Sequence, residues 1–344
     1  MKQGARIGHE LTSGASCRAR TLRCTTIAAS LPPRPAIAPF VRPGNAALPL
    51  PRQAHTSSTV VCKSATFAAA AAFPQVNDGS PASRGFPSWI AAVRGICFYL
   101  TTFAFATPLF LVMLAVYPFV MVLDKYRRRG EHVVNNIWAK LTTLFYYPVK
   151  ISGLENLPPS NQPAVFISNH QSFLDIYTLF HLNRDFKFIS KTSNFLIPII
   201  GWSMFLTGHV MINRVDRRSQ LECLKACGQL LKNGASVLFF PEGTRSKDGK
   251  MHAFKKGAFS VAAKAKVPVV PITLLGTGDL MPNSKEYLLY PGKVEVIIHP
   301  AVAPSDADTM MTSAYKAVAS SLDPSKIATE DDGSAVLQSG DVSE

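Results

Sequence analysis

A run of 29 residues without a charge, from Gly95 to Leu123, constrains this chain more than any other feature of its sequence. About 20 apolar residues are enough for a helix to cross the hydrocarbon core of a bilayer. Arg94 precedes the run, and a basic cluster that would stay with the lipid phosphates follows it, namely Lys125, Arg127, Arg128 and Arg129. The residues 89–130 are therefore predicted to form a membrane-anchoring helical segment.

Pro108 and Pro118 interrupt the apolar run. They allow either a kinked helix that spans the bilayer or two short helices that dip into one leaflet. By the positive-inside rule, the basic end faces the compartment of synthesis or its descendant. The length of the run argues against an ordinary buried core helix, and the choice between spanning and dipping stays open.

The first 62 residues have the composition of an organellar targeting segment. Residues 1–63 hold nine Lys or Arg and one acid, so they carry +8 of the net charge of +14. The stretch is rich in Ser, Thr, Ala and Pro and lacks the apolar core of a secretory signal. The letters VVCKS resemble a chloroplast processing site cut after Cys62, which predicts a plastid transit peptide over 1–62 and a linker over 63–88. A mitochondrial presequence and a merely disordered basic tail are the alternatives.

Short apolar runs alternate with amphipathic stretches over residues 131–325. Strands are predicted at 149–152, 164–168, 186–190, 210–213, 236–240, 267–274 and 294–299, and helices at 173–181, 219–232, 256–264 and 306–322. Ser219 and Glu222 have the spacing of a capping box. Strands separated by helices predict an α/β domain with a largely parallel sheet flanked by helices on both faces. Residues 326–344, with five acids and no base among the last fifteen, are predicted to be a disordered acidic tail.

The cysteines predict neither a metal site nor a disulfide framework. The six of them form no CxxC pair. Cys223 and Cys227 lie four residues apart in a predicted helix, which suits two small core residues better than a zinc site without further ligands. A reducing compartment is consistent with this pattern.

The letters NHQSFLD, residues 169–175, place a histidine and an aspartate directly behind a buried strand. A loop there lets the carboxylate of Asp175 reach one imidazole nitrogen of His170. The carboxylate would fix the tautomer, and the other nitrogen would face a substrate hydroxyl. A structural hydrogen bond or a helix cap is the alternative interpretation of the pair.

The chain offers this base no nucleophile of its own. It has no G-x-S-x-G elbow, no Walker phosphate loop and no acidic metal cluster. If His170 is a base, it must then activate a hydroxyl on the substrate itself. The reaction would be a direct transfer onto an alcohol.

A second polar cluster follows the strand that ends near Phe240, in the letters PEGTRS. Arg245 suits bidentate recognition of a phosphate, and Gly243 would let the backbone approach it. Lys255 and Lys256 near a helix start would add positive charge. A solvated surface loop is the alternative interpretation.

Four sequence blocks in this order resemble the glycerolipid acyltransferases of the lysophosphatidic acid acyltransferase type. NHQSFLD and FPEGTRS lie about seventy residues apart, GHVMINR ending at Arg214 lies between them, and VPVVPI at 267–272 follows. The resemblance covers about residues 145–300. It does not extend to the first 80 residues or to the acidic tail.

The resemblance implies a role for each matching residue. His170 would be the general base for the sn-2 hydroxyl of 1-acylglycerol 3-phosphate, and Asp175 would orient it. The block that binds the glycerol phosphate is matched by Glu242, Gly243, Thr244 and Arg245, with Arg245 as the phosphate ligand and Arg214 as a second one. The resemblance implies no metal, no cofactor and no covalent intermediate.

The donor would be an acyl thioester of acyl carrier protein or coenzyme A. Residues 186–266 carry fourteen Lys or Arg and four acids, a surface that would attract an acidic carrier or anionic membrane lipids. No nucleic-acid motif accompanies this charge.

The predicted location of the protein is the inner envelope of the plastid, with the catalytic domain facing the stroma. Transfer to glycerol 3-phosphate or another lysophospholipid, and a silent membrane lipid carrier, are the alternatives.

Overall fold

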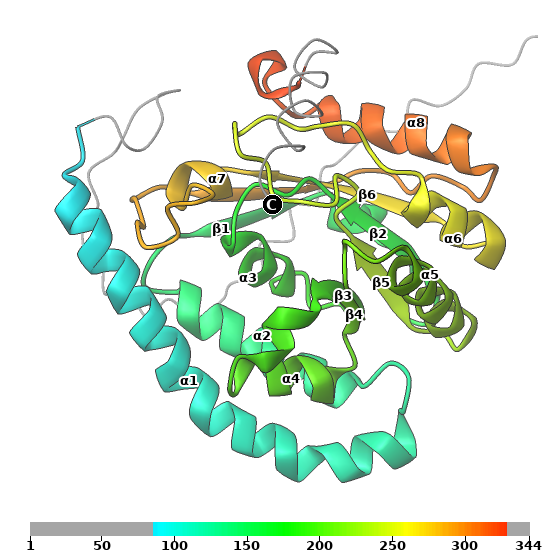
Figure 1. Ribbon diagram of the computed structural model, residues 1–344, viewed down its shortest axis with the longest axis horizontal. Coiled ribbons are helices and arrows are strands. Elements are labelled where there is room, and N and C mark those ends of the chain that lie inside the picture. The colour runs from blue at the N-terminus through cyan, green and yellow to red at the C-terminus, as the bar shows by residue number, and fades with distance from the viewer. Residues whose placement is uncertain (1–84, 329–344) are drawn as a thin grey trace, which may run out of the picture. The chain divides into compact units, whose positions relative to one another are not determined.

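The computed structural model describes residues 85–328 (Figure 1). The predicted transit peptide 1–62, almost all of the linker 63–88 and all but the first three residues of the tail 326–344 lie outside the described residues. So do Cys17, Cys24 and Cys62.

Seven strands form one sheet in the order β1-β7-β6-β2-β5-β3-β4. Their bounds are β1 Val149–Ser152, β2 Val165–Ser168, β3 Phe186–Lys191, β4 Val210–Ile212, β5 Ser236–Phe239, β6 Val269–Leu275 and β7 Val294–Ile298. Every strand pairing is parallel except that of β6 with β7, which is antiparallel. The largely parallel sheet predicted from the sequence is confirmed, and each predicted strand lies within two residues of an observed one.

Helices cover both faces of this sheet. On β2, Phe166 points into one hydrophobic core, whereas Val165 and Ile167 point into another on the opposite face. The first core lies under α1 (Ser88–Leu123), α2 (Arg129–Thr143) and α3 (Leu174–Phe180), and the second lies under α5 (Arg217–Lys232), α6 (Gly257–Ala265) and α8 (Ala307–Ala319). Cys223 and Cys227 are buried in the second core, as predicted.

The apolar run forms one continuous 36-residue helix, α1, with Pro108 and Pro118 inside it. At 1.5 Å per residue it is about 54 Å long, and it bends along its course (Figure 1). Two separate short helices are therefore not formed. α1 is the one helix among residues 85–328 that is long and apolar enough to cross a membrane.

One stripe of α1 packs against the rest of the chain along its whole length. The buried residues recur at helical spacing, in the series Ala91, Gly95, Phe98, Thr102, Ala106, Met113 and Val120. A Cβ atom on Gly95 would lie 2.1 Å from the carbonyl oxygen of Tyr287, so only glycine permits this approach. Arg94 also donates hydrogen bonds to the carbonyl oxygens of Leu289 and Tyr146.

Three helices were not predicted from the sequence: α2, α4 (Ile200–Thr207) and the short α7 (Thr277–Leu280). The predicted capping box at Ser219 is wrong. The helix α5 begins two residues earlier, because the carboxylate of Asp216 accepts hydrogen bonds from the backbone N–H groups of Arg218 and Ser219. Such a carboxylate satisfies two of the orphan donors that every helix start leaves open.

Candidate active site

The predicted site residues meet at one edge of the sheet. His170 follows β2, Arg214 follows β4, and the stretch Glu242–Arg245 follows β5. These three strands are parallel, so their carboxyl ends lie at the same edge. Such an edge is where open α/β sheets bind ligands.

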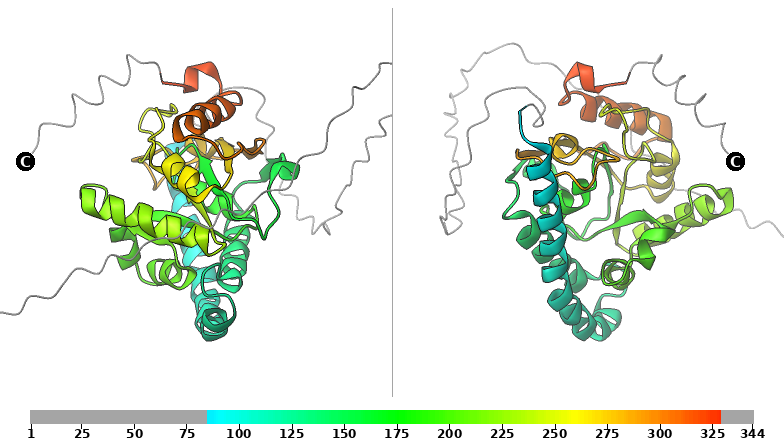
Figure 2. Two further views of the ribbon diagram at one scale, coloured as in Figure 1. Left: turned by 90° about the vertical axis from the view of Figure 1, so that its right-hand side faces the viewer. Right: turned by 60° about the vertical axis from the view of Figure 1, so that its left-hand side comes forward.

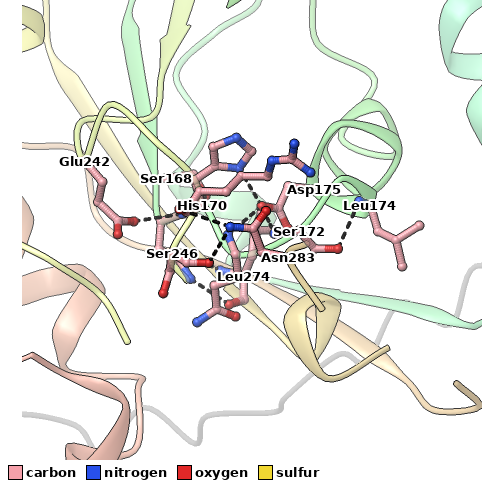
Figure 3. A network of polar contacts seen from close by, with 12 residues as sticks. Ser168, His170, Ser172, Leu174, Asp175, Glu242, Ser246, Leu274 and Asn283 are labelled. Atoms are coloured by element: carbon pink, nitrogen blue, oxygen red, sulfur yellow. Dashed lines mark hydrogen bonds and ion pairs between the residues drawn. The ribbon is translucent and has the colours of Figure 1, made fainter. Parts of the chain in front are cut away.

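The side chain of Asp175 collects three hydrogen bonds on one oxygen, and one of them comes from His170 (Figure 3). Its Oδ2 lies 2.7 Å from Nδ1 of His170, 2.8 Å from the backbone nitrogen of Gln171 and 2.9 Å from that of Ser172. Because a carboxylate oxygen only accepts, Nδ1 carries the proton in this contact and Nε2 keeps its lone pair. The aspartate therefore both holds the turn before α3 and fixes the imidazole tautomer.

The backbone of His170 is tied to the block after β5 on both sides. Its N–H donates to Oε1 of Glu242 over 2.9 Å, and its carbonyl accepts from the N–H of Ser246 over 2.9 Å (Figure 3). The imidazole stacks on the ring of Phe240, with centroids 3.8 Å apart and planes inclined by 14°. The two sequence blocks that lie about seventy residues apart thus form one rigid assembly.

Glu242 lies inside this assembly rather than in the open site. It is 7 % exposed, and its second oxygen accepts the N–H of His252 over 3.1 Å. Gly243 makes the turn with φ +83°, where a Cβ atom would lie 2.6 Å from Nζ of Lys255. Thr244 is exposed. None of these three residues is among those that line the cavity that Arg245 borders.

His170, Arg214 and Arg245 line one cavity of about 320 Å³. The other walls are mostly apolar and come from α1, α2, α3, β3 and α4, with Phe110, Met113, Trp138, Ile176, Phe188 and Met204 among the lining side chains. Nη1 of Arg245 lies 2.8 Å from Oε1 of Glu286, and both side chains are about one-third exposed. The cavity therefore joins an imidazole and two guanidinium groups at its polar end to an apolar space.

Comparison with known proteins identifies the family. The family model described as Acyltransferase matches residues 148–275. A 1-acyl-sn-glycerol-3-phosphate acyltransferase of Chlamydomonas reinhardtii is 60 % identical over 269 residues, which cover 78 % of this chain and 79 % of the relative. This chain belongs to the 1-acyl-sn-glycerol-3-phosphate acyltransferase family.

Two further proteins of this acyltransferase family extend the comparison. A chloroplastic member from Arabidopsis thaliana is 54 % identical over 231 residues, which cover 67 % of this chain and 65 % of the relative. The crystal structure of the 1-acyl-sn-glycerophosphate (LPA) acyltransferase PlsC from Thermotoga maritima superposes with a TM-score of 0.56 at 26 % identity. It covers 73 % of this chain and 99 % of that one. The family expected from the four blocks and the α/β fold expected from the alternation of strands and helices are both confirmed.

Three features of the acyltransferase site were not predicted from the sequence. Phe240 directly precedes the predicted block PEGTRS, but no sequence pattern predicts that its ring stacks on the imidazole of His170. Glu286 lies 41 residues beyond its partner Arg245 in an irregular segment. The apolar wall comes partly from α4, whose sequence IGWSMFLT has no amphipathic period.

Burial lowers the pKa of His170 below its ordinary value of 6.5, and the charges of Arg245 and Arg214 lower it further. The hydrogen bond and the negative charge of Asp175 act in the opposite direction. Because the pKa is lowered, the imidazole of the acyltransferase stays neutral in mildly acidic solution. It is then available as a base without first losing a proton.

In the free acyltransferase, the imidazole of His170 should therefore react in its neutral form below pH 6.5. We expect the rate of inactivation by diethyl pyrocarbonate, which acylates neutral imidazole, to have its midpoint below pH 6.5. Arg245→Met should move the midpoint upward because it removes a positive neighbour, whereas Arg218→Met on the exposed face of α5 should leave it in place. A midpoint at or above pH 6.5, or one that Arg245→Met does not raise, would contradict this electrostatic account.

We expect Glu242→Gln to lower both the stability and the kcat of the acyltransferase, although glutamine has nearly the same shape as glutamate. Burial raises the pKa of Glu242 to about 7, against the two backbone N–H donors that lower it. An amide would point its NH₂ group at one of these donors, and an unmade buried hydrogen bond costs about 1–3 kcal/mol. We expect a lower urea midpoint. If about 1.4 kcal/mol of this cost falls on the placement of His170 in the transition state, kcat falls by about tenfold.

The matched control for this change is Glu295→Gln on β7. Glu295 pairs with the 74 % exposed side chain of Lys150. Exposed pairs of this kind contribute about 0–1 kcal/mol. Equal effects of the two substitutions on the urea midpoint and on kcat would refute the positioning role of Glu242.

Proposed function

We propose that this acyltransferase moves a fatty acyl group from a thioester to the sn-2 hydroxyl of 1-acylglycerol 3-phosphate, giving phosphatidic acid. The observation that carries the proposal is the single cavity lined by His170, Arg214 and Arg245 with an apolar wall beside them. A lysophosphatidic acid presents matching groups, namely a hydroxyl, a phosphate and an acyl chain. The names of the relatives agree with this substrate.

In the proposed reaction Nε2 of His170 takes the proton of the sn-2 hydroxyl as the oxygen attacks the thioester carbonyl. Asp175 stabilises the imidazolium through Nδ1. The new ester C–O bond forms, the C–S bond breaks, and the departing thiolate receives the proton from Nε2. The acyl donor carries its own leaving group, so the proposal invokes no metal, no cofactor and no covalent enzyme intermediate.

Arg245 and Arg214 would hold the phosphate of the acceptor. Burial lowers the pKa of Arg214, and the positive charge of Arg245 lowers it further, so the two guanidinium groups act on one another at the polar end of the cavity. In the structure Arg245 pairs with Glu286. We propose that, when the acceptor binds, its phosphate replaces Glu286 as the partner of the Arg245 guanidinium.

The proposal is tested by comparing acceptors with and without a phosphate. A hydrogen bond to a charged group contributes about 1.5–3 kcal/mol, which corresponds to about 10–150-fold in kcat/KM. We expect Arg245→Met to lose that factor with 1-acylglycerol 3-phosphate and to change little with 1-acylglycerol. Arg218→Met, which removes a charge from the exposed face of α5, is the control.

Equal losses with both acceptors would show that Arg245 does not recognise the phosphate. A wild-type protein that acylates glycerol 3-phosphate in preference to 1-acylglycerol 3-phosphate would overturn the proposed substrate. Assays with acyl carrier protein and coenzyme A thioesters side by side identify the donor. The basic segment 186–266 supports the acidic carrier.

We propose that α1 anchors the domain in one leaflet rather than crossing the bilayer. Ala91 near its start packs on Leu288 and Tyr290, and Val120 near its end is buried beside α2. A helix held to its domain at both ends would draw polar surface into the hydrocarbon if it crossed. The chloroplastic relatives indicate a plastid location, and we place the domain on the stromal side of the inner envelope.

A further inference from the structure

The segment of η2 (Thr192–Leu196) and α4 exposes large apolar side chains to the surroundings. Leu196 is 78 % exposed, Trp202 is 52 % exposed and Phe205 is 60 % exposed. Large apolar groups gathered on one surface mark a contact with a partner or a membrane. No role in the proposed reaction accounts for them.

The opposite side of the same segment lines the cavity. Ile200, Ser203 and Met204 face it from α4, Asn194 faces it from η2, and Ile197 faces it from the turn between them. One helix therefore separates the cavity from the exposed apolar surface. This helix has apolar side chains on both sides, which explains why its sequence shows no amphipathic period.

The exposed side chains are held on a fixed scaffold. A Cβ atom on Gly201 would lie 2.3 Å from the carbonyl oxygen of Phe195, so α4 packs directly on the backbone of η2. The chain reverses in a tight γ-turn in which the N–H of Ile200 donates to the carbonyl of Pro198 over 2.6 Å and Ile199 has φ +63°. Trp202 is thus exposed on a helix that is packed in place, not on a flexible loop.

Two cations close the other end of α4. Arg128 donates to the carbonyl oxygens of Phe205 and Leu206, at 3.0 and 2.7 Å, and the buried Lys187 donates to that of Thr207 at 2.7 Å. Cations at a helix C-terminus satisfy orphan carbonyls and oppose the negative end of the dipole. Arg128 belongs to the link between α1 and α2, so this clamp fixes α4 relative to both helices.

The exposed surface of α4 continues that of α1. The rings of Phe110 and Trp202 lie 6.0 Å apart, and Leu206 packs in one buried cluster with Met113 of α1 and Val134 of α2. The neighbouring outer face of α1 exposes Leu111, Leu114 and Phe119 at 63, 46 and 68 %. Exposed Lys125 and Arg129 lie where α1 ends, and exposed Lys191 lies immediately before η2.

We propose that residues 192–207 form a second bilayer-contacting element, which inserts Leu196, Trp202 and Phe205 into the leaflet that holds α1. The partner is the surface of an anionic lipid bilayer. Apolar side chains that join a lipid-facing helix and are flanked by cations fit that partner. The inference rests on the proposed membrane placement of α1, and it makes the wall of the cavity itself a part of the membrane contact.

Quenching of tryptophan fluorescence by brominated lipid tests the inference. The chain has three tryptophans, Trp89, Trp138 and Trp202. In a Trp89→Phe background, the emission of Trp202 is the difference between the protein with Trp202 and the one with Trp202→Phe. The vesicles contain phosphatidylcholine and phosphatidylglycerol with brominated acyl chains. The aqueous quencher is acrylamide.

Two introduced reporters calibrate the signal in the Trp89→Phe, Trp202→Phe background. Phe119→Trp reports on α1, and Ser313→Trp reports on the exposed side of α8. In both views of Figure 2, α8 in orange-red lies far from the end of α1. We expect brominated lipid to remove most of the emission of Trp202 and of Phe119→Trp, whereas Ser313→Trp should be quenched by acrylamide alone.

The outcomes separate this inference from the proposals on which it rests. Quenching of Phe119→Trp without quenching of Trp202 overturns the inference and leaves the membrane placement of α1 intact. Quenching of neither reporter overturns both. Acyl transfer by the Trp202→Phe protein tests the proposed reaction independently, because Trp202 does not line the cavity.

Discussion

Replacement of His170 by alanine is expected to lower kcat for acyl transfer by about 10²–10⁴-fold, the usual contribution of a positioned general base. The protein should still fold. The contacts that tie residue 170 to Glu242 and Ser246 come from its backbone, and alanine retains them. Purified protein and a coupled assay of thiol release provide the measurement.

The matched control is His252→Ala. His252 also pairs with an aspartate, its Nε2 lying 3.0 Å from Oδ1 of Asp248. Its backbone N–H also donates to Glu242, but its side chain is not among those that line the cavity. We expect nearly unchanged kcat for this variant. Wild-type activity of His170→Ala would end the assignment of His170 as the base.

Asp175→Asn is expected to lower kcat by about 10²–10³-fold with little loss of stability. The amide oxygen can accept the same three hydrogen bonds as Oδ2, so the tautomer of His170 is retained. The amide nitrogen would replace Oδ1, which is buried and has no hydrogen-bond partner among the described residues. The variant loses the negative charge beside the imidazolium. In a medium of effective dielectric constant 20, the attraction between two opposite unit charges 4 Å apart is about 4 kcal/mol.

Two comparisons isolate this charge. Asp175→Ala removes the acceptor of three buried donors and should destabilise the protein, whereas Asp175→Asn should not. The double variant His170→Ala, Asp175→Asn should be no slower than His170→Ala alone, because residues that act as one unit have non-additive effects. A double variant about 10²-fold slower than His170→Ala would mean that Asp175 acts independently of the histidine.

The sequence predicted the sheet well because burial on both faces leaves a direct trace in composition. β2 reads VFIS and β6 reads VVPITLL, short apolar runs that are typical of strands covered on both faces. The contact of His170 with Asp175 was also predictable, since the two residues lie only five positions apart and a single turn brings them together. The proximity of Arg245 and Arg214 was not predicted; it follows from the structure, in which each comes after a strand of the same parallel set.

The remainder of the site depends on distances that local patterns do not encode. Glu242 was expected at the phosphate, yet the structure turns it inward, because two backbone N–H groups from residues 170 and 252 converge on it. α2 was not predicted because much of its buried face is polar, with His132, Asn135 and Asn136 among the buried residues. α4 was not predicted because apolar contacts on both sides remove the period that marks a surface helix.

The approach of Gly95 to Tyr287 has a consequence for how the chain matures. The apolar helix α1 emerges early, but the backbone on which it docks emerges about 190 residues later, and β1 pairs only with the late strand β7. Contacts so distant in sequence form slowly. Until the late strand β7 and the segment around Tyr287 are in place, α1 therefore has only lipid or a chaperone as an apolar partner, and the membrane is a place where folding can be completed.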